Sequence, residues 1–167
     1  MLRAEAGQTE RVAELYEELR DDVYRYLAAT GIQPQTSQEL TQDAFLRLHA
    51  ALLDGNTITN PRAWIFTVAR NLAVNSRRRP EPGGSGEEVD LVSTAEGDNP
   101  EAQVLRAERM ARVHRAFAGL SPQQRQCLSL RAEGFQYKEI AGMMGLAVPT
   151  VGEFLRRGIV KLKDALR

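Results

Sequence analysis

The feature that most constrains this chain is a segment near its middle that lacks any helical or strand periodicity. Residues 80–88 read PEPGGSGEE, and the same mixture of Pro, Gly, Ser and acid continues to Pro100. Residues 80–103 hold seven acidic residues and no basic one, so we expect a flexible, self-repelling linker. The linker divides the chain into two short units, residues 1–79 and 104–167, each large enough for only one small core.

Apolar residues at helical spacing dominate both units, and strand signals are scarce, so we predict an all-α fold of two small helical domains. In the first unit the predicted helices cover residues 10–29, 37–53 and 60–79. Ser37 is a plausible N-cap of the second helix, and Asn60 with Pro61 is a plausible start of the third. Gly31 and Pro34 are expected to end the first. The predicted core residues of this unit are Val12, Leu15, Tyr16, Leu19, Val23, Tyr26, Leu27, Leu40, Ala44, Leu48, Ala51, Leu52, Ile65, Val68, Ala69 and Leu72.

The second unit is predicted to begin with helices over residues 100–118 and from Ser121-Pro122 to Gly134. Residues 137–155 then fit a helix-turn-helix. Ala141 is the small residue where the helices pack, and Gly145 tolerates the positive φ of the turn. The residues expected to pin the two helices together are Ile140, Met144, Leu146 and Val151, with Pro149 in the first turn of the second helix. A plain helical hairpin has the same packing needs.

The charge of the second unit favours a DNA-binding helix-turn-helix over a plain helical hairpin. Residues 104–167 hold twelve basic and five acidic residues, whereas residues 1–79 are balanced with ten of each. A basic unit suggests a polyanionic partner, although an ordinary solvated surface would look similar. The cations that follow the motif are Arg156, Arg157, Lys161 and Lys163, and they suit contacts to phosphates.

The second predicted helix has an unusual outward face. With its core residues inward, the opposite side carries Glu39, Gln42, Asp43, Leu46, Ala50 and Leu53. Leucines mixed with acids on a solvent face suggest a partner protein with apolar and basic character. The alternative is scattered exposed leucines, which are common on protein surfaces.

The third predicted helix carries a strip of aromatic and amide side chains. Its members are Trp64, Thr67, Asn71, Asn75 and Arg78, and Arg77 and Arg79 flank it. Such side chains can stack on bases and hydrogen-bond their edges, which suits single-stranded nucleic acid. Alternatively, Trp64 belongs to the core and Asn71 is a capping or packing amide.

Several classes of function are disfavoured. The single cysteine, Cys127, lies in an apolar pattern and is expected to be a buried thiol. With only two histidines, a metal site is not expected, and neither is any cofactor. We see no signal peptide, membrane span, phosphate-binding loop or nucleophile–base pairing, so we expect a cytoplasmic protein without membrane insertion that is not an enzyme.

Four segments, in order, resemble the bacterial extracytoplasmic-function sigma factors of the sigma-70-type family. Residues 37–48 (SQELTQDAFLRL) are similar to the family's acidic Asp-Leu-x-Gln-Glu-x-Phe segment, and residues 61–72 (PRAWIFTVARNL) to its Arg-Ala-Trp helix. Residues 120–128 (LSPQQRQCL) and 134–141 (GFQYKEIA) are similar to its Leu-Pro-x-x-x-Arg and Gly-x-x-x-x-Glu-Ile-Ala segments.

The resemblance implies a role for each unit. The first, σ2-like, would bind the clamp helices of core RNA polymerase through Glu39, Gln42, Asp43 and Leu46. It would also capture the melted minus-10 element, with Asn71 helping to receive a flipped base beside a specificity loop over residues 54–60. The residues proposed for the minus-10 element are Trp64, Thr67, Asn71, Asn75, Arg77 and Arg78.

The σ4-like unit would contact the polymerase flap and read the minus-35 element as duplex. Its proposed contacts are Arg131, Thr150, Glu153, Phe154, Arg156, Arg157 and Lys161. An anti-sigma factor is a further partner that the resemblance implies. The runner-up interpretation is a helix-turn-helix regulator of sigma-derived fold that does not support initiation.

The start of the recognition helix departs from the family pattern Thr-Val-(Lys/Arg)-Ser-Arg, because Gly152, Glu153 and Phe154 follow Thr150-Val151. Gly152 costs roughly 1 kcal/mol of helix stability relative to alanine, and we expect Gly158 to loosen the helix further. Glu153 would repel phosphates unless it accepts from a cytosine amino group. We therefore expect an altered minus-35 sequence together with weak DNA binding that relies on an activator, and a shift toward protein binding is the alternative.

Overall fold

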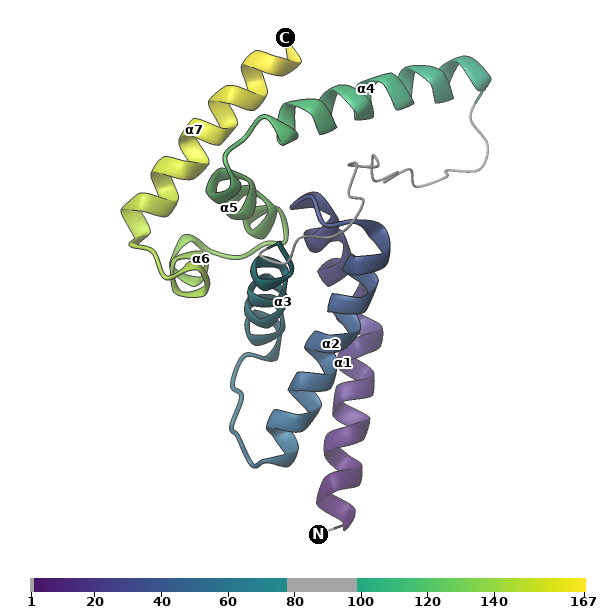
Figure 1. Cartoon of the computed structure of the whole chain (residues 1–167), viewed down its shortest axis with the longest axis vertical. Helices are drawn as coiled ribbons and strands as arrows, with labels where there is room; N and C mark the ends of the chain where they lie inside the picture. Colours follow the sequence, from purple (N-terminus) through teal and green to yellow (C-terminus); the bar gives the residue numbers. More distant parts are fainter. Residues whose placement is uncertain (1, 78–98) are drawn as a thin grey trace. The chain divides into compact units, whose positions relative to one another are not determined.

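The structure is a computed structural model that describes residues 2–77 and 99–167. Within these residues the chain forms only helices, drawn in chain order in Figure 1. They are α1 (Leu2–Ala29), α2 (Pro34–Leu53), α3 (Pro61–Arg77), α4 (Pro100–Ala118), α5 (Pro122–Ala132), α6 (Tyr137–Met144) and α7 (Val148–Leu166). The predicted all-α fold is confirmed.

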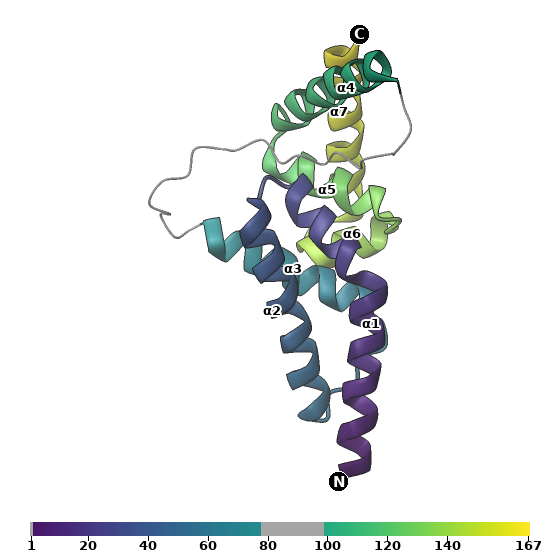
Figure 2. The ribbon, with the colours of Figure 1, turned by 90° about the vertical axis from the view of Figure 1, so that its right-hand side faces the viewer.

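The helices form two compact units. In the first, α1, α2 and α3 all pack against one another, and α1 and α2 lie side by side in both ribbon views (Figures 1 and 2). In the second, α7 packs against both α4 and α5, with α6 preceding it along the chain. None of the described helices is both long enough and apolar enough to cross a bilayer.

Two helices of the first unit begin earlier than predicted. Helix α1 starts at Leu2 rather than residue 10, because its apolar stripe marks only the part that other helices cover. Helix α2 starts at Pro34, so Ser37 is not its N-cap. Proline has no N–H to leave unsatisfied and its φ already suits a first helical position, which makes Pro34 the better start. Ser37 is buried instead, and its hydroxyl donates to the Ile32 carbonyl at 3.2 Å.

The core of the first unit contains two phenylalanines that the periodicity missed. Phe45 packs edge-on against Tyr16 of α1 with ring centroids 5.0 Å apart, and Phe66 lies 5.5 Å from Tyr26. Phe66 is fully buried, and each side chain buried in this way stabilises the fold by roughly 1.5–3 kcal/mol. Of the predicted core residues, Leu19, Val23, Tyr26, Leu27, Ala44, Leu48, Leu52, Ile65, Ala69 and Leu72 are buried. The others are half-buried, and they are Val12, Leu15, Tyr16, Leu40, Ala51 and Val68.

Helix α1 ends where predicted, and α3 is tied to that end. Gly31 adopts a φ of 91°, which lets its own N–H and that of Ile32 bond back to the last turn. A guanidinium nitrogen of Arg77, at the end of α3, donates to the carbonyl oxygen of Thr30. Arg77 therefore satisfies a carbonyl at the C-terminus of α1.

In the second unit, side-chain caps place the first two helices as predicted. The Asn99 side chain accepts from the N–H of Glu101 at the start of α4. At the start of α5, Ser121 and Gln124 form a reciprocal capping box, with Pro122 in the first turn. Helix α4 begins at Pro100, so residues 100–103 are helical and not part of the linker predicted over 80–103. Residues 80–98 of that linker lie outside the described residues.

The helix-turn-helix has the predicted geometry. Gly145 takes a φ of 65° in the turn between α6 and α7, a conformation that residues with a Cβ rarely adopt. Ile140 and Val151 are fully buried, and Pro149 lies in the first turn of α7. Cys127 of α5 is also fully buried, which confirms its predicted role as a small apolar side chain.

Gly158 has a role opposite to the predicted loosening of α7. It is buried where α7 crosses α5, and a Cβ built on it would lie 2.7 Å from Cδ1 and 3.5 Å from Cγ of Leu128. The missing side chain therefore lets the two helices approach closely. The gain in packing offsets the intrinsic cost of glycine in a helix.

Candidate protein and nucleic-acid interfaces

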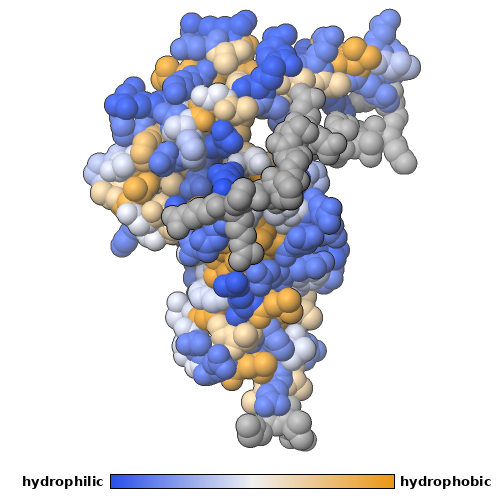
Figure 3. Space-filling view, in the orientation of Figure 1, coloured by the Kyte–Doolittle hydropathy of each residue, from blue (hydrophilic) through white to orange (hydrophobic). Residues whose placement is uncertain are grey.

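The outward face of α2 lies on the surface as predicted. Ala44 and Leu48 point into the core, and the residues opposite them remain accessible. Leu46 is 68% exposed and Leu53 is 45% exposed. Glu39 and Gln42 are exposed and Asp43 is half-exposed. Figure 3 shows hydrophobic and hydrophilic surface interspersed in the first unit. An exposed leucine beside carboxylates can bury apolar area against a partner protein while the acids attract basic residues of that partner.

Hydrogen bonds within the helix orient the two carboxylates of this face. Asp43 Oδ1 accepts from Nε of Arg47 at 3.2 Å, and Glu39 Oε1 accepts from Nε2 of Gln35 at 3.2 Å. Both pairs are exposed, so their net contribution to stability is small. The carboxylates keep further accepting capacity for a partner's cations.

Helix α3 brings its amide and aromatic residues to one accessible strip. Asn71 and Asn75 are exposed, and Trp64 and Thr67 are half-buried, so Trp64 is not a fully enclosed core residue. Asn60, rather than Asn71, is the capping amide, since its Oδ1 accepts from the N–H of Ala63 at 3.0 Å. Asn71 accepts from the neighbouring Arg70 at 3.4 Å. The strip therefore offers amides that are not committed to holding the helix.

The two arginines assigned to this strip differ. Arg77 is exposed but bonds the carbonyl of Thr30, so at least part of its guanidinium stabilises the first unit rather than a ligand. Arg78 lies outside the described residues. Of the predicted minus-10 residues, Trp64, Thr67, Asn71 and Asn75 are thus the ones that the structure places along the strip.

Helix α7 carries a carboxylate between two cations. Oε2 and Oε1 of Glu153 accept from Nε and Nη2 of Arg156, both at 3.0 Å. Oε1 also accepts from Nε of Arg157 at 2.5 Å. The hydrogen bonds from Arg156 and then from Arg157 lower the pKa of Glu153 from 4.5 to about 2. The same contact with Glu153 raises the pKa of Arg156.

The other predicted minus-35 residues have mixed surroundings. Phe154 and Thr150 are half-buried at the beginning of α7. Arg131 donates from Nη1 to the Phe135 carbonyl at 3.3 Å, and Lys161 Nζ lies 3.5 Å from Oε1 of Gln124 in the α5 capping box. Arg131 and Lys161 therefore help to hold α5 in addition to any contact with DNA.

The chain was compared with known proteins. Residues 15–81 match the family Sigma-70 region 2, and residues 110–162 match the family Sigma-70, region 4. The ECF RNA polymerase sigma factor BldN of Streptomyces coelicolor is 35% identical over 152 residues, which cover 86% of this chain but only 55% of BldN. The RNA polymerase sigma-H factor of Pseudomonas aeruginosa is 30% identical over 146 residues, or 80% of this chain and 74% of that protein.

This chain belongs to the extracytoplasmic-function sigma factors of the sigma-70 family. Its fold also resembles that of the sigma factor RpoE, solved in complex with the anti-sigma factor NepR from Bartonella quintana. That likeness has a TM-score of 0.71 at 19% identity and covers 92% of this chain and 95% of RpoE. The helix-turn-helix of the sigma factor lies within the region 4 match, and α2 and α3 lie within the region 2 match.

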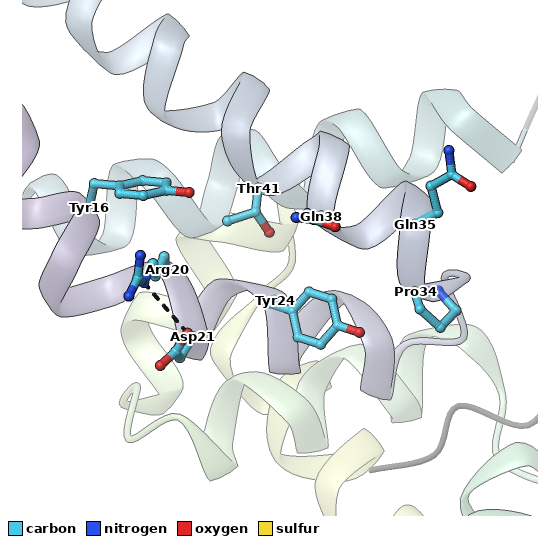
Figure 4. A pocket seen from close by; sticks show the side chains of 8 residues that line it. All are labelled: Tyr16, Arg20, Asp21, Tyr24, Pro34, Gln35, Gln38 and Thr41. Atoms are coloured by element: carbon cyan, nitrogen blue, oxygen red, sulfur yellow. Dashed lines mark ion pairs between the residues drawn. The ribbon is translucent and has the colours of Figure 1, made fainter.

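Sequence reasoning missed one hollow of this sigma factor. An open groove of about 550 Å³ lies between α1 and α2, and both helices contribute its walls (Figure 4). Its lining residues are Tyr16, Arg20, Asp21, Tyr24, Pro34, Gln35, Gln38 and Thr41. Gln35 connects the groove to the outward face of α2 through its bond to Glu39. The early start of α2 at Pro34 forms one end of the groove, and a predicted start at Ser37 could not reveal it.

Proposed function

We propose that this sigma factor binds core RNA polymerase and directs it to promoters, where it takes part in DNA melting and initiation. The observation that carries the proposal is the outward face of α2. Leu46 is 68% exposed, and Asp43 and Glu39 lie about one and two helical turns before it, so the face combines an apolar side chain with acids. Through Glu39, Gln42, Asp43 and Leu46 the face would contact the clamp helices of the polymerase.

The strip on α3 supports a role in holding melted DNA. The amides of Asn71 and Asn75 can pair with base edges, and the half-buried Trp64 can stack on an unpaired base. Thr67 completes the strip in this proposal, and Arg78, with the part of Arg77 not bonded to Thr30, would neutralise phosphates. The minus-10 element would bind here as single-stranded DNA.

The helix-turn-helix supports a role in reading duplex DNA. The exposed residues of α7 would lie in the major groove at the minus-35 element, as the second helix of such motifs does. The proposed contacts are Arg131, Thr150, Glu153, Phe154, Arg156, Arg157 and Lys161. Because Gly152 and Glu153 stand where the family pattern has a cation and a small polar residue, we expect an altered minus-35 sequence and help from an activator.

Further protein partners belong to this function, and a catalytic role for the chain itself does not. The σ4-like unit would also contact the polymerase flap. RpoE of Bartonella quintana was solved with an anti-sigma factor, and we propose that a protein of this class holds the present chain inactive. Polymer synthesis belongs to the polymerase, so the sigma factor needs no catalytic residue, metal or cofactor, and it works in the cytoplasm beside the polymerase.

A second candidate is a helix-turn-helix regulator that keeps the sigma fold without supporting initiation. The observation that favours it is the altered start of the recognition helix at Gly152, Glu153 and Phe154. A regulator of this kind would not need the outward face of α2, so the two candidates differ in what that face binds.

Polymerase binding by variants of α2 separates these candidates. We expect the double variant Asp43→Lys/Leu46→Ala to bind purified core polymerase about ten-fold more weakly or worse, because it removes an acid and an apolar anchor together. Glu14→Lys reverses an exposed charge on α1 and should bind as the unchanged chain does. If the double variant retained full affinity in a competition assay with labelled chain, the sigma proposal would lose its main support.

A further inference from the structure

In the recognition helix a carboxylate binds the same arginine donors that a DNA phosphate would bind. Arg156 presents Nε and Nη2 to the two oxygens of Glu153 as a fork, and Arg157 adds a third donor. Guanidinium groups bind phosphate oxygens with the same fork geometry. While the carboxylate is in place, it occupies the Nε–Nη2 edge of Arg156 and Nε of Arg157, which a DNA phosphate could otherwise bind.

The ion pairs between Glu153 and the two arginines are exposed and weak enough for a DNA phosphate to compete with them. The side chains of Arg156 and Arg157 are 64% and 62% exposed, and that of Glu153 is 40% exposed, so the cluster lies at the surface in contact with water. Exposed ion pairs contribute little net stability because water and salt screen them. A phosphate therefore competes with the carboxylate for the two cations at a modest cost, which lowers the affinity of the helix for DNA without abolishing it.

The carboxylate is charged at neutral pH in the chain free of DNA. While it pairs with the two arginines, its pKa of about 2 lies far below neutral pH. The cluster of three residues has a net charge of +1 rather than +2. Sequence-independent binding to DNA depends mainly on the number of phosphates that a protein neutralises. The carboxylate of Glu153 thus reduces by about one the number of phosphates that this helix can neutralise.

We propose that Glu153 is a positioning residue that holds Arg156 and Arg157 in competition with DNA phosphates and so sets a low sequence-independent affinity of this helix for duplex DNA. The inference rests on the proposed function in one respect, that α7 meets duplex DNA. It differs from direct reading of a cytosine by Glu153, because the effect passes through the arginines and not through a base.

The test measures binding of the full chain to several fluorescein-labelled duplexes of different, non-promoter sequence over a series of salt concentrations. Glu153→Gln keeps the shape of the side chain and removes its charge. Near 0.1 M salt it should bind about five-fold more tightly, with a logarithmic salt slope steeper by about 0.9 for one added phosphate contact. Glu153→Asp is shorter by one methylene but still charged, so it should raise the affinity for duplex DNA by less than Glu153→Gln does.

Two controls separate the arginine route from simple charge. Asp164→Asn removes one negative charge from an exposed position near the end of the same helix, away from Arg156 and Arg157, so it should change the affinity less than Glu153→Gln. In the background Arg156→Gln/Arg157→Gln, the added substitution Glu153→Gln should have little further effect.

Three results would overturn the inference. One is an equal gain from Glu153→Gln with and without the two arginines, which would mean direct repulsion of DNA. Another is a loss of affinity confined to duplexes of one sequence, which would mean reading of a base. The third is no gain on any duplex. If transcription with core polymerase persisted in that case, the sigma proposal would stand and only this inference would fail.

Discussion

Glu153 shows how one side chain can change the chemistry of a helix that otherwise keeps its fold. Its carboxylate binds Arg156 and Arg157 within one turn of α7, and its charge is retained because both cations stabilise it. A Cβ added at the preceding Gly152 would lie 3.8 Å from Cε2 of Tyr137, which is an ordinary contact, so packing does not require glycine at this position. Glu153 therefore changes the charge of the α7 surface rather than the packing of the helix.

The titration of Glu153 follows from this geometry. Its folded pKa of about 2 lies below the ordinary 4.5, so the stabilisation from the pairing is complete above about pH 4.5 and is lost as the pH falls toward 2. We expect carbon-detected NMR of the full chain to show a midpoint near 2. In Arg156→Gln/Arg157→Gln the midpoint should return toward 4.5. A midpoint near 4.5 in the unchanged chain would contradict the pairing.

At the scale of the helix, the crossing of α5 and α7 depends on Gly158. We expect Gly158→Leu to destabilise the chain by about 1–3 kcal/mol, because the added atoms meet Leu128 and Gln124 on α5. Urea unfolding measures this free energy. The matched control is Gly142→Leu on α6, where an added Cβ meets nothing within 4 Å. A Gly158→Leu variant as stable as the unchanged chain would show that α5 and α7 do not approach closely.

The sequence predicts elements better than it predicts contacts between them. Asn60, Ser121 and Gly145 mark helix boundaries because their effects are local, and the structure confirms all three. Gly158 was misread because a glycine within a helix has the same local cost whether or not a neighbour needs the space. Phe45 and Phe66 were missing from the predicted core for the same reason, since periodicity does not reveal where two helices cross.

The candidate surfaces were predicted as faces but not in their electrostatic detail. The spacing of Glu39, Gln42 and Leu46 was sufficient to place them on the outside of α2. No spacing rule distinguishes Arg77, which bonds the end of α1, from an arginine that is free for DNA. Glu153 was expected to repel phosphates directly, whereas the structure shows that it first binds the neighbouring cations. Such pairs depend on rotamers, which a sequence does not specify.

At the scale of the molecule, charge is divided between the two units in a way that suits their proposed tasks. Residues 104–167 carry twelve basic and five acidic residues, and residues 1–79 carry ten of each. A basic unit attracts duplex DNA over the distance that salt allows, and a balanced unit with an acidic and apolar helix face can bind a protein. This division of charge suits the proposed function, in which one unit binds the polymerase and the other binds promoter DNA.

Transcription with purified core polymerase tests this central claim most directly. The chain and the polymerase would be incubated with genomic DNA and nucleotides, and the starts of the transcripts mapped by sequencing. We expect discrete starts that depend on the chain, that share two upstream elements, and that are lost with Asp43→Lys/Leu46→Ala. If the chain bound DNA but gave no starts beyond those of the polymerase alone, it would be a DNA-binding regulator and not an initiating sigma factor.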